Sequence, residues 1–164
     1  MPLVRAVSDE RDALLAFLAE QRDGVVNALR GLTDEQAAST PSASELSLAA
    51  IVKHLTACER RWSVVGVAGR EDPEIWPVQD WGAEFRLAED DTAERLLADY
   101  ADVARATDEI VAAVPNLAAP AGPDGFRSIR WVLLHLIEET ARHAGHADII
   151  RESIDGSSAA DLAR

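Results

Sequence analysis

Apolar residues recur every three to four positions in four long stretches of the chain, which is the period of an α-helix with one buried face. These stretches cover approximately residues 9–30, 47–68, 92–114 and 128–153. Neither a strand-like alternation nor an internal repeat competes with them. The pattern therefore predicts an all-α protein.

Short polar residues and a glycine mark the ends of these stretches. Ser8, Ser47 and Ser128 are the predicted N-caps of the first, second and fourth helices, because a hydroxyl can accept a hydrogen bond from the first helical turn. Residues 91–94 have the pattern of a capping box before the third helix. Gly156 is the predicted end of the fourth helix.

Four helices of this length with one-sided apolar stripes pack most simply as a four-helix bundle. A chain of 164 residues with 48% apolar content is long enough for one such domain, which we predict over residues 1–164. The connection over residues 69–90 can run the full length of a bundle. The pattern therefore leaves an up-and-down order and an up-down-down-up order equally open.

The same connection, residues 69–90, is rich in large aromatic side chains among acids and prolines. Trp76, Trp81 and Phe85 lie in it, and it is too long to be a simple connector. It is either a flap over a functional site or a strap packed along the bundle. Large rings bury well in either role, and packing along the bundle is the favoured interpretation.

The formal net charge of −13 argues against a nucleic acid or an anionic membrane surface as a partner. It suits a site that holds a cation, although an acidic surface that keeps the protein soluble is the favoured explanation. A single cysteine, Cys58, excludes an intramolecular disulfide, and the first residues lack a signal-peptide pattern. We therefore expect a cytoplasmic location.

The candidate chemistry is concentrated in the fourth helical stretch. Residues four apart on a helix lie one above the other, so Glu139 and His143 can point at one object, and His135 and His146 fall on the same stripe. His54, in the second stretch, is the remaining histidine. Imidazoles and a carboxylate in this arrangement favour a divalent metal over a hydrogen-bonded polar patch or an exposed stripe. Spacing alone leaves the choice of ligands open.

Two segments carry a resemblance to a known family. LSLAAIVKHLTACERRW (residues 46–62) and IRWVLLHLIEETARHAGHAD (residues 129–148) resemble the DinB/YfiT-like superfamily of proposed metalloenzymes. Within it they are most similar to an uncharacterised actinobacterial branch near the metal-binding domain of mycothiol-dependent maleylpyruvate isomerase. The likeness extends from Ser8 to Gly156.

The resemblance implies a four-helix bundle in up-down-down-up order with a divalent metal between two helices. One ligand comes from the second helix and two from the fourth, which places them on His54, Glu139 and His143. His146 and His135 then lie beside the centre as candidate catalytic groups that move a proton, and His135 is also placed to orient the Glu139 carboxylate. Zinc is the favoured metal, with nickel, iron, cobalt and manganese still open.

Two neighbours of His54 have alternative interpretations. Arg61 lies two turns further along the helix, where its guanidinium can bind a carboxylate of a cofactor or substrate, and a surface ion pair is the favoured alternative. Cys58 lies one turn further along, either as a soft ligand or reactive thiol or, the favoured interpretation, as inert packing.

The resemblance also implies a function. Relatives with known activity use low-molecular-weight thiols such as mycothiol or bacillithiol, so we expect a thiol-dependent transferase or isomerase that takes a small thiol and an electrophilic substrate. A metal-dependent hydrolase and a non-catalytic metal-binding module for stress or interaction are the alternatives. Bundles of this type often pair, and a homodimer is expected, although no apolar seam identifies its interface.

Overall fold

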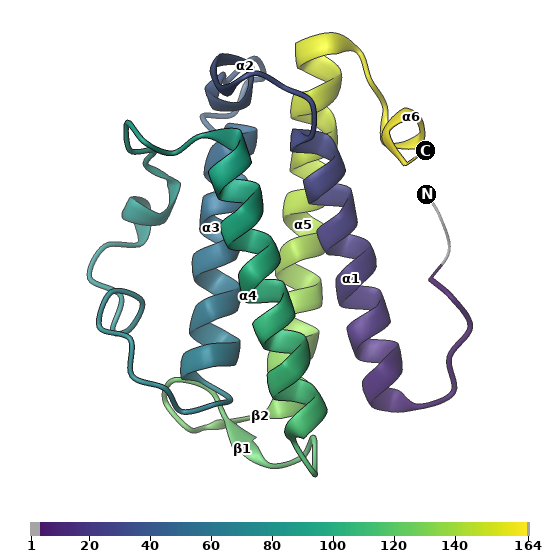
Figure 1. Ribbon diagram of the computed structural model, residues 1–164, viewed down its shortest axis with the longest axis vertical. Coiled ribbons are helices and arrows are strands. Elements are labelled where there is room, and N and C mark those ends of the chain that lie inside the picture. Colours follow the sequence, from purple (N-terminus) through teal and green to yellow (C-terminus); the bar gives the residue numbers. More distant parts are fainter. Residues whose placement is uncertain (1–3, 164) are drawn as a thin grey trace.

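The computed structural model describes residues 4–163, and these residues are predominantly helical (Figure 1). The all-α prediction is confirmed. The six α-helices of the described part are α1 (Glu10–Leu29), α2 (Asp34–Ala38), α3 (Leu48–Arg60), α4 (Ala93–Ala113), α5 (Ile129–Asp155) and α6 (Ala159–Leu162). One difference from the prediction is a pair of two-residue antiparallel strands, β1 (Pro120–Ala121) and β2 (Arg127–Ser128), in the connection before α5.

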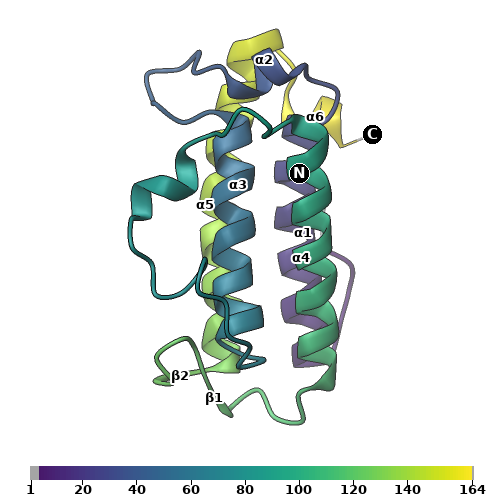
Figure 2. The same cartoon turned by 60° about the vertical axis from the view of Figure 1, so that its left-hand side comes forward.

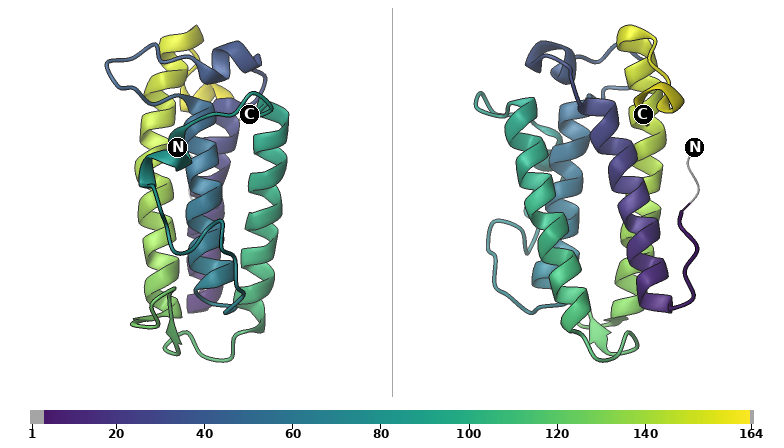
Figure 3. Two further views of the ribbon diagram at one scale, coloured as in Figure 1. Left: turned by 90° about the vertical axis from the view of Figure 1, so that its left-hand side faces the viewer. Right: turned by 45° about the vertical axis from the view of Figure 1, so that its right-hand side comes forward.

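The four long helices α1, α3, α4 and α5 lie side by side (Figures 1 and 2). Followed along the chain, α1 and α5 run in one direction and α3 and α4 in the other (Figure 3). Helix α1 packs mainly against α5, and α3 contacts both α4 and α5. This arrangement brings the second and fourth predicted helices, which carry the histidines, into direct contact.

The helix ends follow local hydrogen-bonding chemistry. Ser47 and Ser128 are the N-caps of α3 and α5, as predicted, and each side chain accepts from a backbone N–H three residues later. Two caps differ from the prediction by one residue: Asp9, not Ser8, caps α1, and Thr92 caps α4 by accepting from the N–H of Arg95. These shifts are small because adjacent residues of the same chemistry compete for one position.

The core has two parts, one at each end of the long helices. The part near α2 is built around Tyr100, Leu55 and Ile51, and the part near the strands around Leu18, Leu133 and Leu136. All six side chains are fully or almost fully buried. Among the described residues, none of the helices combines the length and the apolar content that a membrane crossing needs.

Helix α3 continues beyond Arg60 as a π-helical turn over Arg61–Val65, so the predicted segment 47–68 forms one continuous helical rod from Leu48 to Val65, and its last residues, 66–68, are a turn. The wider turn is visible in the bond from the Gly66 N–H to the Arg61 carbonyl, 2.9 Å. Gly66 lies where the β1–β2 hairpin packs on this rod: its carbonyl accepts from the Gly122 N–H at 3.0 Å, and a Cβ there would lie 3.0 Å from the Gly122 Cα. The hairpin therefore packs on the end of the helical rod, directly after the π-helical turn.

The long connection between α3 and α4 lies against the outer side of α3 (Figure 2). It contains a 3₁₀ helix, Trp81–Phe85, which contacts α3 directly. Lys53 of α3 fastens the end of this connection, because its Nζ donates to the Arg86 carbonyl at 2.8 Å and to the Asp91 carboxylate at 2.6 Å. The segment thus covers the face of α3 that carries His54.

A buried ion pair joins α1 to α3. Arg22 is 6% exposed and Glu59 2% exposed, and the Arg22 guanidinium binds both carboxylate oxygens of Glu59, with Nε–Oε2 at 3.2 Å. Arg22 also reaches the half-exposed Asp108 of α4 at 3.0 Å. Burial raises the pKa of Glu59, and the Arg22 charge opposes that rise. Each buried charge is therefore stabilised by the other in place of water.

Replacing Arg22 alone should destabilise the protein strongly, because Glu59 would remain buried without its counter-ion. We expect Arg22→Met to lower the free energy of unfolding by roughly 3–5 kcal/mol, measured by urea denaturation. The double variant Arg22→Met with Glu59→Leu should recover most of that loss, since it removes both charges. A double variant as unstable as the single one would contradict this account.

Candidate metal centre

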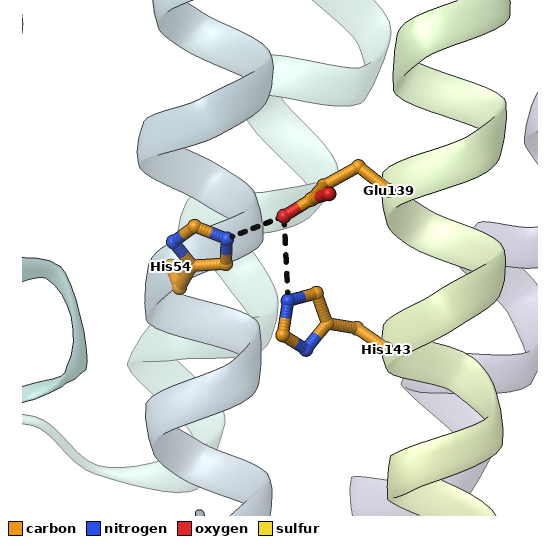
Figure 4. A group of neighbouring side chains, drawn as sticks. All are labelled: His54, Glu139 and His143. Atoms are coloured by element: carbon orange, nitrogen blue, oxygen red, sulfur yellow. Dashed lines mark hydrogen bonds and ion pairs between the residues drawn. The ribbon is translucent and has the colours of Figure 1, made fainter.

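Three side chains predicted to bind one metal meet between α3 and α5 (Figure 4). His54 Nε2 lies 3.2 Å from Glu139 Oε1, and His143 Nε2 lies 3.4 Å from the same oxygen. One donor atom from each of the three residues lies within 4.8 Å of the others. The fold therefore brings together the three residues that the sequence singled out.

The position of the three side chains follows from helix geometry and packing. Glu139 and His143 are one turn apart on α5 and project to the same side. His54 lies on the buried stripe of α3, between Ile51 and Leu55, both of which are almost fully buried. Since α3 packs against α5, the three side chains converge where the two buried stripes meet.

The centre is nearly closed to solvent. His54 is 8% exposed and His143 7% exposed, whereas the Glu139 side chain is 24% exposed. Burial and the neighbouring His54 lower the pKa of His143 to about 4. Burial acts to raise the pKa of Glu139, but the close contact with His54 and the nearby imidazoles leave it below its ordinary value. At neutral pH the centre thus contains a neutral His143 and an ionised Glu139.

These protonation states and distances fit a divalent cation. A metal ion needs deprotonated ligands, which a neutral imidazole and a carboxylate are. Ligand atoms at 2.0–2.1 Å from zinc in tetrahedral geometry are roughly 3.3 Å apart. The two separations to Glu139 Oε1 are 3.2 and 3.4 Å, and all three donor atoms lie within 4.8 Å of one another. The donor set of two nitrogens and one oxygen suits zinc and its neighbours.

Three further side chains surround His54, and one of them, Glu84, was not identified in the sequence analysis. Glu84 Oε2 lies 2.9 Å from His54 Nδ1, and the other Glu84 oxygen forms an ion pair with Arg61. The Phe85 ring stacks on the His54 ring with centroids 4.3 Å apart. Both residues belong to the 3₁₀ helix of the aromatic-rich connection. The aromatic composition of that connection was the only signal in the sequence that it has a role here.

The two remaining histidines lie on either side of the centre. His146 is exposed, and its ring meets that of His143 edge-on at 5.4 Å. His135 is partly buried, stacks on Trp131 at 5.1 Å and meets Trp62 edge-on at 4.9 Å. Burial lowers the pKa of His135. The ring contacts of His135 are with these indoles, and the charge of Glu139, one turn away, acts to raise its pKa against the effect of burial.

Arg61 and Cys58 also have definite surroundings. Arg61 is 2% exposed, so it does not form the surface ion pair that was the favoured alternative. Its guanidinium pairs with Glu84 and lies over the Trp81 ring at 4.8 Å, and its Nε has no hydrogen-bond partner among the described residues. Cys58 is 4% exposed, and burial raises the pKa of its thiol to about 12, in agreement with inert packing.

The lowered pKa of His143 predicts a pH-dependent stability for the metal-free protein. Its folded-state pKa of about 4 lies below the ordinary value of 6.5, so the unfolded chain binds the proton more readily. The contribution of His143 to the free energy of unfolding is complete above the ordinary pKa and is lost as the pH falls toward about 4, by on the order of 1–3 kcal/mol.

Urea denaturation across this pH range measures the effect. His143→Asn should flatten the dependence, whereas His146→Asn, which changes an exposed imidazole, should leave it in place. An equally steep pH dependence in His143→Asn would show that other groups cause it.

Comparison with known proteins adds to this geometry. The search of curated proteins gives no significant match to the chain. Among solved structures, a conserved protein from Enterococcus faecalis superposes with a TM-score of 0.64 at 19% sequence identity, over 92% of this chain and 100% of that chain. At this identity the similarity shows a shared fold and carries no further conclusion about function.

A family model gives the stronger result. The model described as mycothiol-S-transferase matches residues 13–156, a span that includes the whole of α3 and all three residues of the centre. The chain therefore belongs to the mycothiol-S-transferase family, as the resemblance to the DinB/YfiT-like superfamily predicted.

Proposed function

We propose that this protein is a divalent-metal-dependent transferase that joins a mycothiol-type thiol to an electrophilic substrate. The observation that carries the proposal is the convergence of His54, Glu139 and His143 in a member of the mycothiol-S-transferase family. The four long helices form the scaffold, which we interpret as a four-helix bundle in up-down-down-up order over a single domain of residues 1–164.

In this proposal His54, Glu139 and His143 are metal ligands, and zinc is the favoured ion. When bound, the ion lowers the pKa of a coordinated thiol, so that the reactive thiolate forms near neutral pH. Glu139 faces both imidazoles with one oxygen, so it holds the two helices at a fixed separation around the ion. Three protein ligands leave a further coordination position for the thiol.

His146 and His135 are the proposed catalytic groups for moving protons. His146 is exposed beside His143, so it can exchange protons with solvent next to the centre. An exposed imidazole can both accept and donate a proton, which suits this role. His135 is partly buried among indole rings, and its lowered pKa keeps it neutral and able to accept a proton.

Arg61 is the proposed binding residue for a carboxylate of the thiol or the substrate. A buried guanidinium with an unpaired Nε has a donor available in addition to the one that pairs with Glu84. The partners in this proposal are therefore a small thiol and an electrophile. We propose that the protein works in the cytoplasm as a homodimer.

The low exposure of the centre favours a second candidate function, a non-catalytic metal-binding module. His54 and His143 are less than one tenth exposed, and a closed site is typical of a structural metal. Thiol binding separates the two functions, because a sealed centre has no position for an external ligand.

The metal assignment is tested by elemental analysis of the purified protein. We expect about one divalent ion per chain in the wild type, and strongly reduced content in His54→Ala and His143→Ala, since each loses one of three protein ligands. His146→Ala should keep the wild-type content. Equal metal content in all four proteins would remove the ligand assignment.

The thiol assignment is tested by titrating mycothiol into the zinc-loaded and the metal-free protein in a calorimeter. Binding should occur only to the loaded form, because the ion supplies the position that the sulfur takes. Cys58→Ser should bind as the wild type does, since this thiol is buried and has a strongly raised pKa. A protein that binds zinc but does not bind mycothiol in the zinc-loaded form would instead support the non-catalytic module.

A further inference from the structure

We propose that Glu84 is a positioning residue of the metal centre, whose carboxylate holds His54 with Nδ1 protonated and Nε2 free to bind the ion. The inference rests on the proposed metal-binding function and adds to it a residue that lies outside both helices of the centre. It also assigns a role to the connection between α3 and α4.

Each carboxylate oxygen of Glu84 has a different partner. Oε2 lies 2.9 Å from His54 Nδ1, and Oε1 pairs with a terminal nitrogen of Arg61. The three side chains are buried together, with 12% of Glu84, 10% of His54 and 3% of Arg61 exposed. A carboxylate held on both oxygens in this way has little freedom to rotate.

The charge of Arg61 determines which way the hydrogen bond to His54 runs. A guanidinium can only donate, so the Glu84 oxygen that pairs with Arg61 accepts, and a carboxylate paired in this way also accepts at its other oxygen. His54 Nδ1 must therefore be the donor. A neutral imidazole carries one N–H, so Nε2 is left with its lone pair directed toward Glu139.

The other side of His54 then requires a cation. Nε2 and Glu139 Oε1 are 3.2 Å apart, and with Nδ1 protonated both are acceptors in the neutral ring. Two buried acceptors at this distance repel each other unless a proton or a metal ion lies between them. A histidine that gives one nitrogen to a metal and the other N–H to a carboxylate is the usual arrangement around bound metals.

The ring plane of His54 is held by the same segment. Phe85 follows Glu84 in the chain and stacks on the imidazole with an angle of 18° between the ring planes. Trp81, at the other end of the 3₁₀ helix, covers the Arg61 guanidinium. One short helix therefore holds both the edge and the face of His54, and it also contacts Arg61, which pairs with Glu84.

The two imidazoles of the centre differ in this respect. His143 Nδ1 is buried and has no hydrogen-bond partner among the described residues. Of these two imidazoles, His54 is the one whose Nδ1 contacts a carboxylate. We therefore expect substitutions at Glu84 to act on His54 alone, which makes the inference open to a site-specific measurement.

The first measurement is zinc affinity, determined by competition with a chromogenic chelator for the wild type, Glu84→Ala and Glu84→Gln. Glu84→Ala should weaken binding about 10- to 100-fold, because the orientation of His54 is lost. Glu84→Gln should weaken it less, since the amide oxygen can still accept from Nδ1. The control is Glu74→Gln, which removes the same charge from an exposed position of the same connection and should bind as the wild type does.

The second measurement needs no metal. Nitrogen-15 NMR of the metal-free protein at mildly alkaline pH reports which nitrogen of His54 carries the proton. The wild type and Glu84→Gln should show protonated Nδ1, and Glu84→Ala should show a mixture of both forms. Glu84→Gln conserves side-chain volume, so it carries the test if Glu84→Ala fails to fold.

The two measurements separate the possible failures. A wild type that binds no zinc would refute the proposed metal-binding function, and the NMR result would still decide the role of Glu84. Unchanged zinc affinity together with an unchanged His54 proton position in Glu84→Ala would overturn the inference. Equal loss in Glu74→Gln would also overturn it, because the effect would then arise from charge on the connection as a whole.

Discussion

One carboxylate oxygen facing two imidazole nitrogens is the interaction on which the rest of the structure depends. Glu139 Oε1 lies close to His54 of α3 and to His143 of α5, between two helices whose buried faces are mostly apolar. Polar groups buried in such surroundings cost several kcal/mol unless they are paired through a shared proton or a metal ion. The contact between α3 and α5 is therefore favourable only in the register that brings these three groups together.

Polar contacts away from the centre support the same register. The Arg22–Glu59 pair ties α1 to α3 directly before the π-helical turn, and the Ser63 hydroxyl lies 2.8 Å from that of Thr107 in α4. Each of these groups is buried, so a slip of either helix along its neighbour would leave a charge or a hydroxyl without a partner. Apolar stripes alone tolerate such slips far better, since their contacts are not directional.

The sequence predicts what local chemistry and periodicity determine. The long helices follow from apolar spacing, the caps Ser47 and Ser128 from their hydroxyls, and the pairing of Glu139 with His143 from the length of one turn. The choice of His54 as their partner needed the resemblance to a family. Glu84 was out of reach, because its place at His54 depends on how a 22-residue connection folds back on α3. The burial of Arg61 was missed for a related reason, since the π-helical turn that begins there has no clear signature in the sequence.

Glu84 lies in the connection between α3 and α4 and not in one of the four long helices, which has a consequence for the motion of that connection. Coupling between two equilibria is reciprocal. If packing of the 69–90 connection on α3 raises the affinity for a metal ion by some factor, binding of the ion favours the packed connection by the same factor. Excursions of this segment from the helix surface then become rarer as the centre fills. The rate at which the backbone amides of this segment exchange with solvent therefore reports whether a metal ion is bound between α3 and α5.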